Sequence, residues 1–488
     1  MSQRIAGPLA DHRLGLETLD REVAGAELAV EGSLPPWLSG TLLRTGPARF
    51  EVGARPYRHW FDGLAMLHSF QIEAGRVSYA NRYLESDAYA AAKKTGRIAY
   101  AEFATDPCRS LFRRIFSLFV PPRPGNNANV NIVQLGERFL ALTETPLPVE
   151  FDPRTLRTVG VGDPAPGQLT VAHPHYAPKS GELVSYATRF GPRTVYRLYA
   201  LGPGGRRLVA TIPSPRPSYM HSFAITERHA VLVEFPFVVH PLAIPLSGRP
   251  FIENYRWQPQ RGTVFTVVEL ASGRLVGRYR AEPFFAFHHA NAYEQEGELV
   301  VDLCAYPDSG IIDFLYLDRL RQAEPKLPTP RLTRCRVPLG GGSVAVEPLG
   351  DAALELPRIN YGRCNGRPYR YLYGVRAVEP HGFLATIVKV DVEGGTVSSW
   401  SQPGAYAGEP VFVPTPNGGA EDEGLLLSVV LDGPAGRSFL LVLDARDLRE
   451  VARAYAPHPI PFGFHGIFAA GQTGPGSATP PGGGGPAP

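Results

Sequence analysis

The chain has 488 residues, of which 44% are hydrophobic and 19% are charged, so it can bury a large core and is not expected to be disordered. Its formal net charge of +3 is spread along the sequence without a block of like charges, which excludes a nucleic-acid-binding arm. The sequence contains no secretory signal and no apolar run of roughly 18 residues, so a cytoplasmic protein without spanning helices is expected.

Strand-length segments recur through the whole chain. They are rich in β-branched and aromatic residues and are bounded by some of the 52 glycines and 49 prolines, as in RVSYANRYL, HAVLVEF, ELVVDLCAY and LLLSVVL. Pairs such as TVFTVVELASGRLVGRYR and IVKVDVEGGTVSSW indicate hairpins closed by glycine-containing turns. The chain is therefore predicted to be all-β, and evenly spaced hairpins over most of its length favour a propeller over a sandwich.

One long domain is expected, with a short segment at each end. Residues 1–30 are interpreted as an N-terminal extension and residues 31–470 as the propeller with its cap insertions. Residues 471–488 are rich in glycine and proline and cannot bury a core, so they are predicted to form a disordered tail. The four cysteines have no CxxC spacing, so buried reduced thiols are expected at Cys108, Cys304, Cys335 and Cys364.

Helical segments are few. They are predicted at Asp87–Thr95, Arg109–Phe119 and Ile311–Ala323, where they would decorate one face of the propeller as a cap. The segment Cys108–Pro121 places apolar side chains around Arg113 and Arg114, which suits a helix lying in a membrane interface. A helix that faces the protein core is the alternative.

Four histidines occur in strand-like segments far apart in the sequence. Their motifs are AHPH, YMHSF, FHHANAY and FGFHGIF, each with small or aromatic neighbours. Histidines on the inner strands of different blades would point to a common axis, where neutral imidazoles suit iron, zinc, copper or nickel. Ordinary core histidines are the alternative, and separation in sequence does not decide between the two.

Three glutamates lie in similarly apolar settings. They are Glu144 in ALTETP, Glu355 in LELPR and Glu409 in AGEPVF. A histidine ligand usually gives its second ring proton to a carboxylate or carbonyl, so three such carboxylates would suit a site with several histidines. Solvated strand glutamates are the alternative.

Many segments, in order from about Gly32 to Phe468, resemble the carotenoid cleavage oxygenases. They include GTLLRTGPARFEVG, HWFDGLAMLHSF, DPCRSLFRRIFS, ALTETPLPVEFDPRTL, FFAFHHANAYEQEGELVVDLCAY, LELPRINYGRCNGRPYRYLYG and AGEPVFVP. The chain is most similar to the animal-type branch, which contains β-carotene oxygenases and a retinoid isomerohydrolase. This resemblance implies a seven-bladed β-propeller with a small helical cap over an axial iron(II) centre.

The resemblance also assigns the residues of that centre. The implied metal ligands are His173 of AHP, His221 of HSF, His288 of FHHANA and His465 of FHG. The implied supporting carboxylates are Glu144, Glu355 and Glu409. Adjacent strand residues point to opposite faces, so only one of His288 and His289 can reach the axis, and the motif selects His288. The motif alone selects His173 over His175, and it marks His59 and His68 as structural.

The implied reaction is oxidative scission of a conjugated double bond in a carotenoid or apocarotenoid, with dioxygen activated at iron(II). The expected substrate is β-carotene, cut at its central 15,15′ bond to give retinal. Thr143, Tyr219 and Phe287 are expected to face the substrate, with core packing as the alternative role. The family presents an apolar patch at the position of Cys108–Pro121, so peripheral membrane association is expected.

Four other functions remain open at this point. They are eccentric apocarotenoid cleavage, stilbene cleavage, retinoid isomerohydrolysis and carotenoid binding without catalysis.

Overall fold

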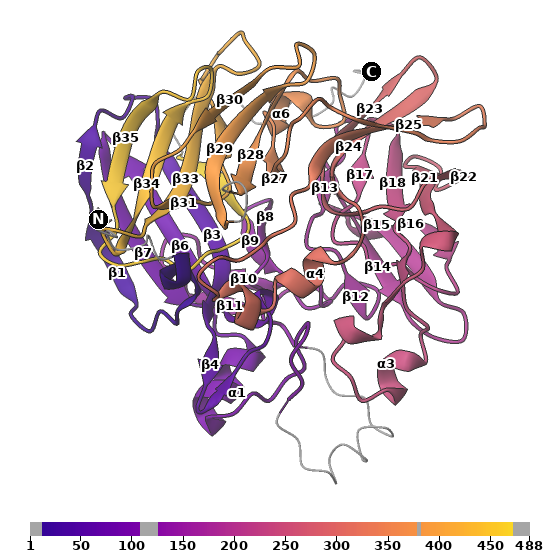
Figure 1. Cartoon of the computed structure of the whole chain (residues 1–488), viewed down its shortest axis with the longest axis horizontal. Helices are drawn as coiled ribbons and strands as arrows, with labels where there is room; N and C mark the ends of the chain where they lie inside the picture. The colour runs from indigo at the N-terminus through magenta and orange to yellow at the C-terminus, as the bar shows by residue number, and fades with distance from the viewer. Residues whose placement is uncertain (1–11, 108–124, 378–381, 472–488) are drawn as a thin grey trace, which may run out of the picture.

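A computed structural model describes residues 12–107, 125–377 and 382–471 of the chain. Within these residues, seven antiparallel sheets of four to six strands form the blades of a β-propeller (Figure 1), which confirms the predicted fold class. Inner strands of successive blades contact one another around the axis, as β17 does with β23 and β23 with β27.

The first three blades have the following strands. The first blade contains β1 (Val23–Glu27), β7 (Arg76–Tyr83), β6 (Leu64–Glu73), β3 (Gly40–Arg49) and β36 (Gly466–Ala470). The second contains β8 (Asn131–Leu135), β9 (Arg138–Leu142), β10 (Val149–Phe151) and β11 (Thr158–Val161). The third contains β12 (Leu169–Thr170), β13 (His175–Tyr176), β14 (Leu183–Arg189), β15 (Val195–Gly202) and β16 (Gly205–Pro213).

The other four blades continue around the ring. The fourth contains β17 (Ala224–Ile225), β18 (His229–Glu234), β21 (Thr263–Glu269) and β22 (Leu275–Ala281). The fifth contains β23 (Phe285–Gln295), β24 (Glu298–Tyr306), β25 (Arg331–Pro338) and β26 (Ala345–Pro348). The sixth contains β27 (Glu355–Arg358), β28 (Tyr371–Ala377), β29 (Leu384–Asp391) and β30 (Val397–Trp400). The seventh contains β31 (Ala405–Ala407), β32 (Val411–Pro414), β33 (Gly424–Asp432), β34 (Arg437–Asp444), β35 (Glu450–Tyr455) and β2 (Ala29–Gly32).

Burial follows the position of a strand within its blade. The middle strand β34 is buried at seven consecutive positions because both its faces pack against other parts of the protein, which explains its continuous apolar run. The outer strand β26 is exposed at every position. Two further pairs of short strands lie outside the blades: β4 (Glu51–Val52) with β5 (Arg55–Pro56), and β19 (Phe237–Val238) with β20 (Arg256–Trp257).

Strands from both ends of the described chain close the ring. The late strand β36 pairs with β3, and the early strand β2 pairs with β35. Indigo and yellow strands consequently lie side by side in Figure 1. Residues 23–30 form β1 and part of β2, so the boundary expected at residue 31 falls inside a propeller strand.

The helices gather mainly at one end of the ring. Figure 1 shows α1 and α3 in the lower part of the molecule, α4 near the middle and α6 near the upper edge. The short helices are η1 (His12–Leu16), η2 (Trp60–Asp62), α3 (Ala243–Leu246), η3 (Ile252–Asn254), η4 (Pro259–Arg261), α4 (Ile311–Phe314), α5 (Leu317–Leu320) and α6 (Tyr361–Cys364). Among the described residues, no helix is long and apolar enough to cross a membrane.

Two of the predicted helices can be compared with the structure. The helix predicted at Asp87–Thr95 is confirmed as α1, where Ser86 caps the first turn and Gly96 ends the helix with φ +63°. The segment Ile311–Ala323 forms α4 and α5 instead of one helix. The break arises because Tyr316 is extended (ψ 138°) and forms a β-bridge with His59.

Some predictions fall outside the described residues. These are the helix at Arg109–Phe119, the interfacial segment Cys108–Pro121, and the tail beyond residue 471. Cys304, Cys335 and Cys364 are buried free thiols, while Cys108 also lies outside the described part.

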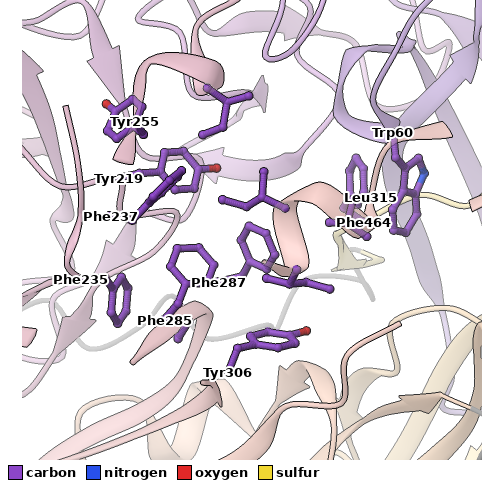
Figure 2. Packing of buried hydrophobic residues seen from close by; sticks show 14 of the residues in the cluster. Trp60, Tyr219, Phe235, Phe237, Tyr255, Phe285, Phe287, Tyr306, Leu315 and Phe464 are labelled. Carbon is purple, nitrogen blue, oxygen red and sulfur yellow. The ribbon is translucent and has the colours of Figure 1, made fainter. Parts of the chain in front are cut away.

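The largest buried cluster is aromatic and lies beside the propeller axis. Figure 2 shows Tyr219, Phe237 and Tyr255 together at one side, and Trp60, Leu315 and Phe464 at the other. Trp60 lies on η2, Leu315 follows α4 and Phe237 lies on β19, while other members of the cluster, such as Phe265 and Phe285, lie on blade strands. The cluster therefore joins the helical end of the molecule to the blades.

Candidate metal centre and adjoining cavities

Four histidines from four different blades meet inside the propeller. His173 lies between β12 and β13, His288 lies on β23, and His465 directly precedes β36. His221 precedes β17. One ring nitrogen from each histidine lies within 4.8 Å of the corresponding nitrogen of every other. The structure thus brings together the four side chains that the motifs select.

The ring nitrogens fit a metal ion. His173 Nε2 lies 3.1 Å from His221 Nε2, and His288 Nε2 lies 3.0 Å from His465 Nε2. Two imidazole nitrogens at right angles about a metal, with bonds of about 2.1 Å, lie about 3.0 Å apart. If both nitrogens of such a pair carry lone pairs, they repel at this distance unless a cation lies between them.

A glutamate orients three of the four rings. His221 Nδ1 donates to Glu144 over 2.7 Å, His288 Nδ1 to Glu355 over 2.6 Å, and His465 Nδ1 to Glu409 over 2.6 Å. An ionised carboxylate only accepts hydrogen bonds, so Nδ1 carries the proton in each ring and the Nε2 lone pair is directed at the centre. His173 has no carboxylate contact among the described residues.

The glutamates are held by further donors. Tyr219, which was expected to face the substrate, is fully buried and donates its hydroxyl to Glu144 Oε1 over 2.8 Å. Glu409 accepts from Arg358 Nε over 2.8 Å and from the Gly466 backbone N–H over 3.0 Å. The ring orientations of His221 and His465 therefore depend on residues that are not themselves part of the histidine cluster.

Protonation also suits metal binding. Burial lowers the pKa of His173 well below its usual range, and the neighbouring imidazoles lower it further. Burial lowers the pKa of His465 to about 3, although Glu409 opposes the shift. Burial raises the pKa of Glu409, but Arg358 and His465 outweigh it and hold the value well below its usual range. At neutral pH these two imidazoles are neutral, as a metal ligand must be.

A bulge in β23 separates His288 from His289. The pairing of β23 with β24 shifts between Ala286 and His289, which inserts an extra residue on β23. His288 consequently joins the cluster, whereas His289 Nδ1 lies 2.7 Å from Ser222 Oγ. His175 is also directed elsewhere, with Nε2 3.0 Å from the carbonyl oxygen of Phe223.

Two cavities adjoin the four histidines. The larger has a volume of about 820 Å³ and is lined by Thr143, Glu144 and His221. The smaller, about 70 Å³, is lined by Phe287 and by His221, His288 and His465. Both have mostly apolar walls, as expected for a site that binds an apolar ligand. Thr143 therefore lies on the wall of the larger cavity and Phe287 on the wall of the smaller one.

Phe61 is a lining residue that no sequence pattern singles out. It lines both cavities, and its ring stacks on His221 at a centroid distance of 5.9 Å. Asn129 holds this loop by donating to the carbonyl oxygens of Phe61 (2.9 Å) and Gly63 (2.8 Å). The asparagine-rich stretch NNANVN was the sequence signal for this loop. Buried side-chain amides need hydrogen-bond partners, and here the backbone around Phe61 supplies them.

Comparisons with known proteins were made for the whole chain. The family model described as retinal pigment epithelial membrane protein matches residues 16–470. A carotenoid isomerooxygenase of Galleria mellonella is 35% identical, over 96% of this chain and 98% of the relative. A β,β-carotene 15,15′-dioxygenase of Rattus norvegicus is 34% identical, over 90% of this chain and 88% of the relative.

The fold is also similar to solved structures. Cobalt-substituted apocarotenoid oxygenase of Synechocystis superposes with a TM-score of 0.83 at 30% sequence identity. The match covers 94% of this chain and 98% of the Synechocystis chain.

Proposed function

The chain belongs to the carotenoid oxygenase family, and on this premise we propose that it is an iron(II)-dependent dioxygenase that cleaves a conjugated double bond of a carotenoid. The observation that carries this proposal is the cluster of four histidines at the meeting point of two apolar cavities. The two cavities would hold the two arms of one polyene, so that the bond to be cut lies beside the histidines.

His173, His221, His288 and His465 would hold the iron. When bound, iron(II) supplies the activation of dioxygen that a hydrocarbon double bond requires. The closeness of the Nε2 atoms and the cobalt-substituted form of the Synechocystis relative support a metal at this position. Imidazoles alone do not distinguish iron from zinc or copper, so the choice of iron rests on the dioxygenases among the relatives.

The protein itself would bind, orient and exclude water. Glu144, Glu355 and Glu409 keep the proton on Nδ1 of their histidines and add negative charge that offsets a divalent ion. Phe61 and Phe287 contribute apolar rings to the cavity wall beside the histidines. The reaction adds both atoms of dioxygen across the broken double bond and yields two carbonyl products, so no side chain needs to act as an acid or base.

For β-carotene, we propose scission at the central 15,15′ bond to give retinal. The similarity to the rat dioxygenase named for this bond supports the proposal. Chromatography of the products tests it directly. Two molecules of retinal per molecule of β-carotene are expected, and apocarotenals of unequal length would contradict it.

We also propose that the protein associates peripherally with membranes through the mouth of the larger cavity. Leu242 and Leu246 are 61% and 68% exposed, and Leu242 lines this cavity together with Ile244. An apolar substrate could pass from a bilayer into the cavity at this position. The double variant L242S/L246S should float less with liposomes and keep its iron, whereas unchanged flotation would contradict the proposal.

Metal content and turnover test the enzymatic proposal. Protein reconstituted with iron(II) under nitrogen should bind about one equivalent and convert β-carotene once oxygen is admitted. His288→Ala should abolish both iron binding and conversion of β-carotene. The variant of the adjacent residue, His289→Asn, is the matched control and should keep its iron. Absence of near-stoichiometric iron would overturn the dioxygenase assignment. Conversion of a retinyl ester without cleavage of β-carotene would indicate an isomerohydrolase. Binding of a carotenoid without formation of products would indicate a non-catalytic carrier.

A further inference from the structure

The wall of the larger cavity contains a carboxyl group with one oxygen that has no partner among the described residues. Glu102 lines this cavity together with Phe61, Phe103 and Phe251. Part of the residue is accessible, but its Oε1 atom is buried and has no hydrogen-bond partner within residues 12–107, 125–377 and 382–471. A buried polar atom without a partner is rare in folded proteins and requires an explanation.

Burial favours the uncharged form of the Glu102 carboxyl group. Burial raises the pKa of Glu102 well above its usual range, and the nearby charge of Asp62 raises it further, against a smaller opposing effect of Asn127. Asp62 is also buried, but it accepts hydrogen bonds from the backbone of His59 and Ala104 and from the Thr105 hydroxyl. Of the two neighbouring acids, Asp62 has the donors that stabilise a carboxylate, whereas the uncharged form is favoured for Glu102.

A neutral carboxyl group differs chemically from the rest of the cavity wall. It has one O–H donor and one carbonyl acceptor, whereas most neighbouring side chains are apolar. Thr145, which lines the same cavity, also has a buried hydroxyl oxygen to which no described residue is hydrogen-bonded. In an apolar pocket, a few polar groups of this kind fix which ligand binds and in which orientation.

The position of Glu102 suits contact with one arm of a bound polyene. The ring of the adjacent Phe103 lies 5.2 Å from the ring of Phe61, which in turn stacks on His221 at 5.9 Å. Glu102 therefore lines the cavity on the same segment as Phe103, whose ring is linked to the histidines through Phe61. An oxygen atom on that arm of the substrate would meet a hydrogen-bond donor, and a pure hydrocarbon would leave the donor unpaired.

We propose that Glu102 is a specificity-determining residue that donates a hydrogen bond to a hydroxyl or carbonyl oxygen on the polyene arm in the larger cavity. The enzyme consequently prefers oxygenated carotenoids and apocarotenoids to hydrocarbons such as β-carotene. This inference rests on the proposed function, because it assigns the larger cavity to substrate.

The test compares two variants on two substrates. Glu102→Met removes the donor at similar side-chain length, and Glu102→Gln keeps an N–H donor. The ratio of kcat/KM for an apocarotenal to kcat/KM for β-carotene is measured with iron-loaded protein. Loss of one neutral hydrogen bond corresponds to a decrease of about threefold to tenfold in this ratio for the methionine variant. The glutamine variant should retain most of the wild-type ratio.

Binding under nitrogen separates this inference from the proposed function. Apocarotenal and β-carotene are titrated into iron-loaded protein, and the shift of their absorption bands is followed. The methionine variant should bind the apocarotenal more weakly by the same factor. If the methionine substitution changed the affinities for both polyenes equally, or changed neither affinity, the proposed role of Glu102 would be overturned. A wild-type protein that binds but cleaves no polyene would overturn the dioxygenase proposal, and the binding comparison would still decide on Glu102.

Discussion

Replacing Glu409 by glutamine would test how strongly the carboxylates orient the histidines. Glu409 Oε1 accepts from His465 Nδ1 (2.6 Å) and Arg358 Nε (2.8 Å), and Oε2 accepts from the Gly466 N–H (3.0 Å). Glutamine has the same shape as glutamate, but its amide nitrogen would face an N–H donor whether it replaced Oε1 or Oε2. A donor left unpaired in the interior costs about 1–3 kcal/mol.

Glu144→Gln is the matched control. Glu144 uses only Oε1, which accepts from His221 Nδ1 and from the Tyr219 hydroxyl, and no described residue donates to Oε2. The amide nitrogen can therefore occupy the Oε2 position without a clash of donors. We expect iron(II) affinity to fall about 100-fold in E409Q and about tenfold in E144Q, the two ends of the range for such partners. Metal-free E409Q should also lose about 2 kcal/mol of unfolding free energy.

Anaerobic competition with a chromophoric chelator measures the affinities, and urea unfolding of the metal-free proteins measures stability. Equal losses in the two variants would refute the reasoning, because the charge removed is the same and only the arrangement of donors differs. A larger loss of iron(II) affinity in E144Q than in E409Q would also refute the reasoning.

Three further predictions concern stability. Burial lowers the pKa of His59 to about 3, so its neutral form stabilises the fold at neutral pH and that contribution is lost as pH falls below about 6.5. From pH 7 to pH 5 the unfolding free energy should fall by about 2 kcal/mol less in His59→Asn than in the wild type, and identical urea titrations would contradict this. Phe439→Ala should cost about 3–5 kcal/mol because Phe439 is 0% exposed, whereas Val397→Ala, at a site 43% exposed, should change stability little. Removing bound iron with a chelator should lower Tm, since at 100 times Kd the metal adds about 2.7 kcal/mol, and an unchanged Tm would argue against a bound metal.

The strand pattern predicted the fold class well. Alternating and continuous apolar segments identified strands such as β7 and β34, and the helix α1 was predicted with the bounds that it has in the structure. Local propensity could not predict the break at Tyr316, because the extended backbone there is stabilised by a bridge to His59, about 250 residues away in sequence. Very short strands such as β12 and β13 also lack a pattern of their own.

The sequence identified the residues of the candidate site but not their arrangement in space. The motifs selected four histidines, and the structure brings their nitrogens together. Alternation allowed only one of His288 and His289 at the axis, but the bulge in β23 depends on pairing with β24 and is not encoded in local spacing. The role of Tyr219 as a donor to Glu144 likewise depends on packing between blades.

The closure of the ring also determines when during its lifetime the protein can acquire a metal. The fourth histidine, His465, directly precedes β36, which pairs with β3 from the other end of the described chain. A nascent chain therefore displays at most three of the four imidazoles until His465 has left the ribosome. On the assignment proposed for these residues, iron loading follows the completion of synthesis, and a truncated product would carry no competent centre.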